Sequence, residues 1–141
     1  MADARGERLL QAVARLHRWA TRHAELEVSP AQARLLALMG EVGPARVGDL
    51  AEADHCSQPT MTAQVQRLEA RGWAEREPDP TDGRASLVRL TPAGSTVLRR
   101  ARKARAAVVS PLLADLTPHE QQVIDEAVTI LTRLVERDAK A

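Results

Sequence analysis

The side chains that could perform catalysis are few in this chain of 141 residues, and their spacing keeps them apart. The histidines are His17, His23, His55 and His119, and the two that share a predicted helix are six positions apart, so they face different ways. Cys56 is the only cysteine, which excludes an intramolecular disulfide and a cysteine-rich zinc site. The sequence also lacks a glycine-rich phosphate loop and a nucleophile elbow. We therefore expect a protein that is not an enzyme and holds no metal or cofactor.

Residues 57–71 offer a different chemistry, hydrogen bonding to nucleic acid. On a helix that turns about 100° per residue, Met61, Val65 and Leu68 share one apolar face. A helix that enters a major groove about 12 Å wide needs small, uncharged side chains on its outer face, because the phosphates expel bulk and carboxylates. Outside the apolar face, with no carboxylate before Glu69, the segment carries Ser57, Gln58, Pro59, Thr60, Thr62, Ala63, Gln66 and Arg67. A plain amphipathic surface helix has the same pattern, so this helix alone leaves both interpretations open.

The elements that must position these residues are predicted by apolar spacing and by helix caps. Ser29, Thr91 and Thr117 are each followed by proline, an arrangement that starts a helix. Pro111 is expected to bend or interrupt the helix that contains it. The predicted helices cover residues 4–25, 30–42, a short segment around 47–51, 58–71, 92–115 and 118 onwards, with strands at 73–77 and 85–90. The helix over 30–42 is apolar nearly all round and should be buried.

The segment between the two strands, residues 78–83, is dense in turn-forming residues. Its last dipeptide, Asp82-Gly83, is typical of a tight hairpin turn. We therefore expect Asp82 and Arg84 at the tip of a hairpin, where an arginine has no structural task. Two helices joined by a tight connection over residues 54–57 and followed by a hairpin predict a winged helix-turn-helix.

In this order of elements and in several short segments, the sequence resembles the MarR family of winged helix-turn-helix transcription regulators. The segments are Leu50-Ala51, 57–62 (SQPTMT), 68–73 (LEARGW), 79–84 (DPTDGR) and 90–94 (LTPAG). The opening Gln58-Pro59-Thr60 is most similar to SlyA-type members. The resemblance implies a mostly helical fold with a small β-hairpin wing. It also implies one domain over 1–141, with a DNA-binding region over 30–92 and dimerisation helices in 1–28 and 93–141.

The resemblance assigns roles to individual residues. The helix over 57–71 is implied to be the recognition helix, and Asp82 to orient the Arg84 guanidinium so that it enters the minor groove. The family function that this implies is sequence-specific binding of double-stranded DNA at palindromic operators, usually as a repressor.

Two positions depart from the family pattern. His55 stands where glycine is usual in the helix-helix turn, and histidine tolerates a positive φ better than most side chains. Ala63 stands where relatives often have arginine, which removes one contact to phosphate or base. We expect binding to depend more on Arg46, Arg67 and Arg84.

Apolar stripes lie near both ends of the chain. Leu9, Val13 and Leu16 recur at helical spacing, as do Ile130, Leu131 and Leu134. The resemblance implies that these stripes meet in a two-fold homodimer, which presents two recognition helices to half-sites about one helical turn apart. Packing of the stripes within a single chain is the alternative.

Family members often bind small anionic aromatic compounds between the dimer helices and the winged helix. Candidate residues for such an effector pocket are His17, Arg18 and Trp19, with Arg99, Arg102 or Arg105 on the long helix. For the basic run 99–105, a solvated face and phosphate contacts are the other interpretations, and Trp19 also suits a core or interface position. Cys56 is expected to be a buried, inert thiol rather than a redox sensor.

The charge distribution sets a limit on these expectations. The net charge is +1, and residues 46–90 hold six basic and eight acidic side chains, a balance of −2. DNA must therefore be held by local donors rather than by the field of the whole molecule. A winged helix that contacts only other proteins is the competing function. No apolar run reaches membrane-spanning length and no signal peptide is recognisable, so we expect a cytoplasmic protein.

Overall fold

The part of the chain that the structure describes forms six helices and one antiparallel hairpin, in the predicted order. The computed structural model describes residues 2–138, and side chains from residue 4 onwards, so the outermost residues of both predicted dimerisation segments lie outside the described range. The elements are α1 (Ala2–His23), α2 (Pro30–Val42), α3 (Val47–Ala53), α4 (Gln58–Ala70), β1 (Ala74–Asp79), β2 (Asp82–Leu90), α5 (Pro92–Ala114) and α6 (Pro118–Asp138).

The predicted caps start the helices. The Ser29 hydroxyl accepts the backbone N–H of Gln32 at 3.1 Å, and the Gln32 side chain accepts the Ser29 N–H at 3.1 Å, which completes a capping box before α2. Thr117 and Glu120 exchange the same pair of bonds before α6, at 3.2 and 3.0 Å. Each bond satisfies an amide that the first helical turn leaves unpaired.

The hydrophobic core lies among α2, α3, α4 and the base of the hairpin. Leu36, Leu50, Met61, Leu68 and Val88 are fully buried there. They come from four different elements, so the core fixes these elements relative to one another. Helix α2 contributes Ala33, Leu35, Leu36 and Met39 to this core. Its other side is exposed at Arg34, Glu41 and Val42, so the expectation of a helix buried all round is wrong.

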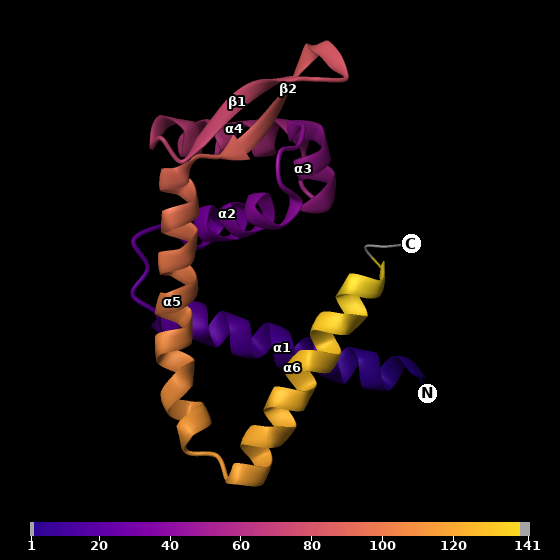
Figure 1. Ribbon diagram of the computed structural model, residues 1–141, viewed down its shortest axis with the longest axis vertical. Coiled ribbons are helices and arrows are strands. Elements are labelled where there is room, and N and C mark those ends of the chain that lie inside the picture. Colours follow the sequence, from indigo (N-terminus) through magenta and orange to yellow (C-terminus); the bar gives the residue numbers. More distant parts are fainter. Residues whose placement is uncertain (1, 139–141) are drawn as a thin grey trace.

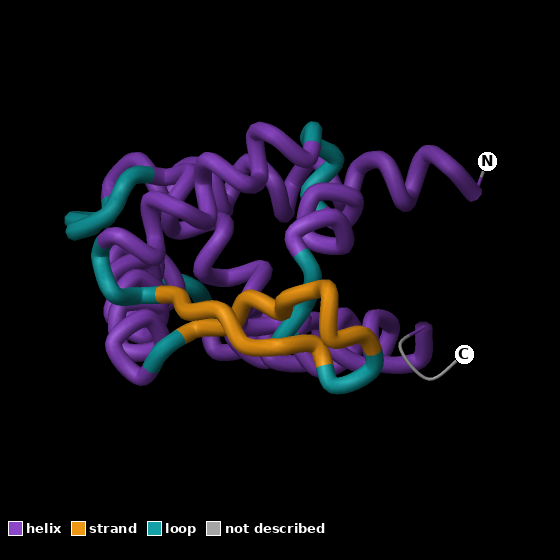
Figure 2. Tube along the Cα trace, turned by 90° about the horizontal axis from the view of Figure 1, so that it is seen from above, coloured by secondary structure: helices purple, strands orange, loops and turns teal. Residues whose placement is uncertain are grey.

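The remaining helices extend from this core (Figure 1). Helix α5 runs from the hairpin down the molecule, α1 packs across its middle, and α6 returns from the far end of α5. In α1 Ala20 is the only described side chain that is buried, and no residue of α6 is buried. Helices α1 and α6 overlap in Figure 1 but lie on opposite sides in the view of Figure 2. One copy of the chain therefore leaves both helices largely uncovered.

The hairpin differs from the prediction at its tip. The two-residue turn is Pro80-Thr81, and Asp82-Gly83 opens β2 instead of forming the turn. The turn closes early because one carboxylate oxygen of Asp79 accepts both the N–H and the hydroxyl of Thr81, at 2.8 and 2.7 Å. The predicted Asp-Gly turn is therefore wrong, and both strands are longer than expected.

A bulge follows the turn. Asp79 pairs with Asp82, whereas Pro78 pairs with Ser86, so residues 83–85 bulge out of β2. Bulges bend a strand and re-aim its side chains. The bulge places Arg84 beside the tip rather than at it.

Pro111 was expected to bend or interrupt α5, but the helix continues to Ala114. Proline removes one helical hydrogen bond and lies in the last turn here, so little of the helix depends on that bond. The prediction of an interruption is wrong.

Gly94, in the first turn of α5, allows a close contact that a side chain would prevent. A Cβ atom there would overlap the carbonyl oxygen of Trp73, whose backbone cannot move without displacing the hairpin. We predict that Gly94→Ala lowers the free energy of unfolding by about 2 kcal/mol or more. Gly48→Ala is the control, because a Cβ at Gly48 in α3 meets only ordinary contacts. Equal stability of the two variants in urea unfolding would contradict this packing.

Candidate nucleic-acid interface

Helix α4 separates an anchored face from a free face, as its sequence predicted. Met61, Val65 and Leu68 are buried in the core. Thr62 is half-buried. The other residues predicted to contact DNA from this segment are exposed: Ser57, Gln58, Pro59, Thr60, Ala63, Gln66 and Arg67. The face is small, polar and free of carboxylates, so it can approach the edges of base pairs.

The start of α4 is ordered by its own side chains. The Ser57 hydroxyl accepts the N–H of Thr60 at 3.2 Å and donates to the Thr60 hydroxyl at 2.8 Å. The first turn contains no acidic residue. Its remaining amides and the positive end of the helix dipole therefore face outward, where a phosphate can accept hydrogen bonds.

The turn between α3 and α4 contains one residue in the left-handed conformation, which glycine adopts most easily. His55 has a φ of 54°, and it is the only non-glycine residue with a positive φ in the part of the chain that the structure describes. The expectation that histidine supports this turn is confirmed. Cys56 packs against the core but is only half-buried, less than expected.

Arg84 is exposed in the bulge of β2, and Asp82 acts on its backbone. One carboxylate oxygen of Asp82 accepts the N–H of Arg84 at 3.0 Å. Within residues 4–138 no ion pair joins the Asp82 carboxylate to the Arg84 guanidinium, so the expected direct orientation of the side chain is not observed. Asp82 shapes the bulge and leaves the guanidinium of Arg84 free.

Arg46 lies immediately before α3 and is bound to the hairpin. Its Nε and Nη2 atoms contact one oxygen of Asp79 at 2.8 and 2.7 Å. The hydroxyl and N–H of Thr81, and then the Arg46 guanidinium, lower the pKa of Asp79 to about 2. The same hydrogen bond and charge raise the pKa of Arg46. Arg46 was expected to contact DNA, but in this structure it bonds Asp79.

Sequence reasoning missed Asp79. Its side chain is only 6% exposed although it stands near the tip of an exposed hairpin. The available signal was local, because an aspartate two residues before a threonine can close its own turn. Its second partner, Arg46, is 33 residues away, and the sequence gives no indication of that pairing.

Most carboxylates of residues 46–90 are paired with arginines within the fold. Arg76 pairs with Glu69 at 3.1 Å, and Arg89 pairs with both Glu75 and Glu77, at 2.7 and 3.4 Å. The guanidinium of Arg71 stacks over the Trp73 ring at 4.4 Å. Among the described residues, the exposed arginines of α4 and the hairpin that form no ion pair or ring contact are Arg67 and Arg84. These are cations that can contact phosphates.

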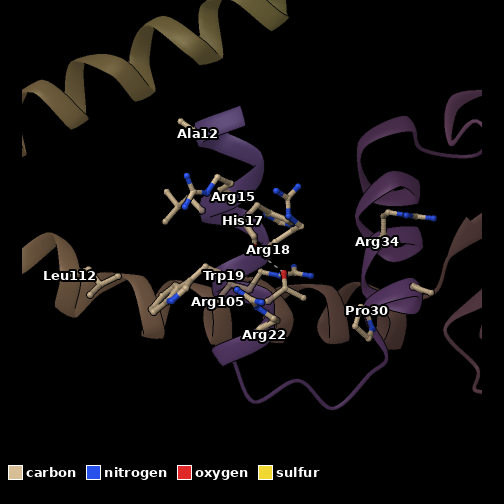
Figure 3. Close-up of a pocket in the computed structure, with 13 residues that line it drawn as sticks. Ala12, Arg15, His17, Arg18, Trp19, Arg22, Pro30, Arg34, Arg105 and Leu112 are labelled. Carbon is tan, nitrogen blue, oxygen red and sulfur yellow. Dashed lines mark hydrogen bonds between the residues drawn. The ribbon is translucent and has the colours of Figure 1, made fainter. Parts of the chain in front are cut away.

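A basic groove of about 920 Å³ lies between α1, α2 and α5 (Figure 3). His17, Arg18 and Trp19 line it, whereas Arg102 does not, and α5 contributes Arg105 instead. Arg105 donates to the Thr21 hydroxyl at 3.1 Å, and partial burial lowers its pKa. The further basic residues of the lining are Arg15, Arg22 and Arg34. Of the three arginines of α5 that were candidates for this pocket, Arg105 lines the groove and Arg99 and Arg102 do not.

The described helices include none that is long and apolar enough to span a membrane. Together, the α3–turn–α4 pair, the hairpin and the exposed arginines define a winged helix-turn-helix protein.

Comparison with known proteins identifies the family. Residues 28–86 match the model of the MarR family. An uncharacterised HTH-type transcriptional regulator of Mycobacterium bovis is 31% identical over 77% of this chain and 76% of its own length. This chain belongs to the MarR family of transcriptional regulators.

Solved structures share the fold over almost the whole chain. A transcriptional regulator of Thermotoga maritima, Tm0710, superposes with a TM-score of 0.76 at 27% identity, over 98% of this chain and 99% of that one. The PcaV transcriptional regulator of Streptomyces coelicolor, solved in complex with its natural ligand, is 28% identical with a TM-score of 0.55, over 91% of this chain and 89% of that one. These matches confirm the predicted architecture, a mostly helical chain with a winged helix-turn-helix.

The backbone of His55 generates a prediction about stability. Glycine adopts a positive φ without the steric cost of a Cβ atom, although it also makes the unfolded chain more flexible. His55→Gly should therefore raise the free energy of unfolding by a net of about 0.5 kcal/mol. His55→Ala keeps the Cβ atom and should give no such gain. A loss of stability on thermal unfolding of His55→Gly would show that the imidazole itself stabilises the turn.

Proposed function

We propose that this protein is a homodimeric transcription regulator that binds palindromic sites in double-stranded DNA, acts as a repressor, and is released by a small anionic aromatic ligand. One observation carries the proposal: α4 presents a carboxylate-free polar face beside a hairpin with an exposed, unpaired Arg84. A winged helix contacts DNA with a helix in the major groove and with an arginine of the hairpin in the minor groove.

The first turn of α4 is the segment that can reach base edges. Gln58 and Thr60 are exposed there and carry the hydrogen-bonding groups that read bases. Ser57, Pro59, Thr62, Ala63 and Gln66 contribute shape and backbone contacts, and Arg67 contributes a phosphate contact. Arg84 lies along or in the adjacent minor groove.

The uncovered helices support dimerisation. Leu9, Val13 and Leu16 of α1 are 39%, 46% and 51% exposed, and Ile130 and Leu134 of α6 are 46% and 52% exposed. Contiguous apolar surface of this kind marks an interface. A second copy of the chain covers it with the same two stripes, as a two-fold axis requires.

We predict that Leu134→Glu converts the dimer into a monomer, because the carboxylate would be buried without a partner. Thr129→Glu, on the polar side of α6, should leave the dimer intact. Sedimentation at micromolar concentration measures both. A wild-type monomer, or a Leu134→Glu dimer, would contradict this interface.

Arg84→Ala should weaken DNA binding without affecting the fold, because an exposed arginine contributes little to stability. The slope of log affinity against log salt should also fall by about 0.9, the value for one phosphate contact in B-DNA. Arg133→Ala removes the same charge from α6 and is the control. If the wild-type protein retards no duplex even at low salt, the surface of α4 and the hairpin contacts another protein instead.

The basic groove is the site proposed for the effector. Its arginines suit a carboxylate, and Trp19, which stacks on His23 at 4.4 Å, offers an aromatic surface. The ligand-bound PcaV regulator supports ligand control in a protein of this fold.

We predict that benzoate changes the fluorescence of Trp19 in a Trp73→Phe background, where it is the only tryptophan. Benzyl alcohol, which lacks the charge, should bind at least about tenfold more weakly, and Arg105→Gln should remove most of this difference. The same concentrations of benzoate should release DNA. Equal responses to benzoate and benzyl alcohol would show that the groove does not select anions.

A further inference from the structure

Among the side chains that the structure describes, one from outside the hairpin, Arg46, holds the tip of the hairpin. The base of the hairpin is fixed by the core, through Trp73, Ala74 and Val88, and by two backbone hydrogen bonds between Ala45 and Val88, at 2.8 and 3.1 Å. Val88 pairs with Arg76, so the strands continue beyond this anchor before they reach the turn. From Pro78 to Arg84, Asp79 is the only buried residue.

Asp79 connects the tip to the helix-turn-helix. One of its oxygens closes the turn by accepting from Thr81, and the other accepts both contacts from Arg46. Arg46 immediately precedes α3, the helix that packs against α4. The chain of contacts therefore runs from the recognition helix through α3 and Arg46 to Asp79. Asp79 pairs with Asp82, which stands two positions before Arg84.

We infer that the Arg46–Asp79 ion pair is a positioning contact that sets where Arg84 stands relative to α4, and thereby determines how strongly the hairpin contributes to DNA binding. Neither residue needs to touch DNA for this role. The inference rests on the proposed DNA-binding function.

Electrostatics and positioning predict opposite results for the same substitution. Asp79→Asn removes a negative charge from a DNA-facing surface and releases Arg46, so charge alone predicts tighter binding. If the pair positions Arg84, the substitution weakens binding instead. Asparagine keeps an oxygen that can accept from Thr81, so the turn can still close. Glu77→Gln is the matched control, because it removes the same charge from the same strand and Arg89 keeps its shorter contact with Glu75.

The binding experiment uses a duplex that the wild-type protein selects from a random pool. Asp79→Asn should bind it roughly tenfold more weakly, which corresponds to the loss of about one good contact, whereas Glu77→Gln should bind equally or more tightly. In an Arg84→Ala background, Asp79→Asn should have no further effect. Unchanged or tighter DNA binding by Asp79→Asn would overturn the inference. An equally large weakening of DNA binding by Asp79→Asn in the Arg84→Ala background would also overturn it.

A second measurement needs no DNA. Amide hydrogen exchange over residues 79–86 should accelerate in Asp79→Asn, while α4 keeps its protection, because only the tip loses its anchor. Unchanged protection at the tip would overturn the inference even if the protein binds DNA. If the wild-type protein selects no duplex although exchange at the tip accelerates, the proposed function fails and the structural contact stands.

Discussion

The close contact between Gly94 and the backbone of Trp73 determines how the two halves of the molecule are joined. Around it, the Thr91 N–H donates to the Trp73 carbonyl at 3.0 Å, and the Thr91 hydroxyl donates to the Gly72 carbonyl at 2.6 Å. The end of α4, the first strand of the hairpin and the start of α5 meet at this junction. Because α5 also lines the basic groove, the junction connects that groove directly to α4 and the hairpin.

Two apolar surfaces of different kinds are built on this junction. The core among α2, α3 and α4 is closed within one chain, so it holds α4 rigidly. The stripes of α1 and α6 are open, and α6 has no buried residue among those described. In a single copy these stripes would face water, so burying them against a second copy accounts for two long helices that the core does not need. In the proposed dimer, this interface sets the separation of the two α4 helices.

Local signals in the sequence predicted most of the fold. Capping residues such as Ser29 and Thr117 act within one turn of their own helix, and the buried face of α4 follows from a 3.6-residue period, so both were predictable. The error in the hairpin turn was local, because Asp79 closes the turn by accepting from Thr81, two residues away. The contacts that local signals could not predict depend on three-dimensional placement. They are the pairing of Asp79 with Arg46 and the lining of the groove, where the rotation of α5 decides between Arg102 and Arg105. The apolar stripe of α6 could be anticipated from its spacing, but a single chain does not show what covers it.

The central claim is that two copies of α4, held by a two-fold dimer, read the sequence of double-stranded DNA. Selection from random duplexes with the purified protein tests it most directly. We expect enrichment of an inverted repeat whose half-sites are about one helical turn apart, and relaxed preference at one or two base pairs in each half-site for a Gln58→Ala/Thr60→Ala variant. No enriched sequence, or an unchanged preference in that variant, would contradict the assignment of α4 to the major groove.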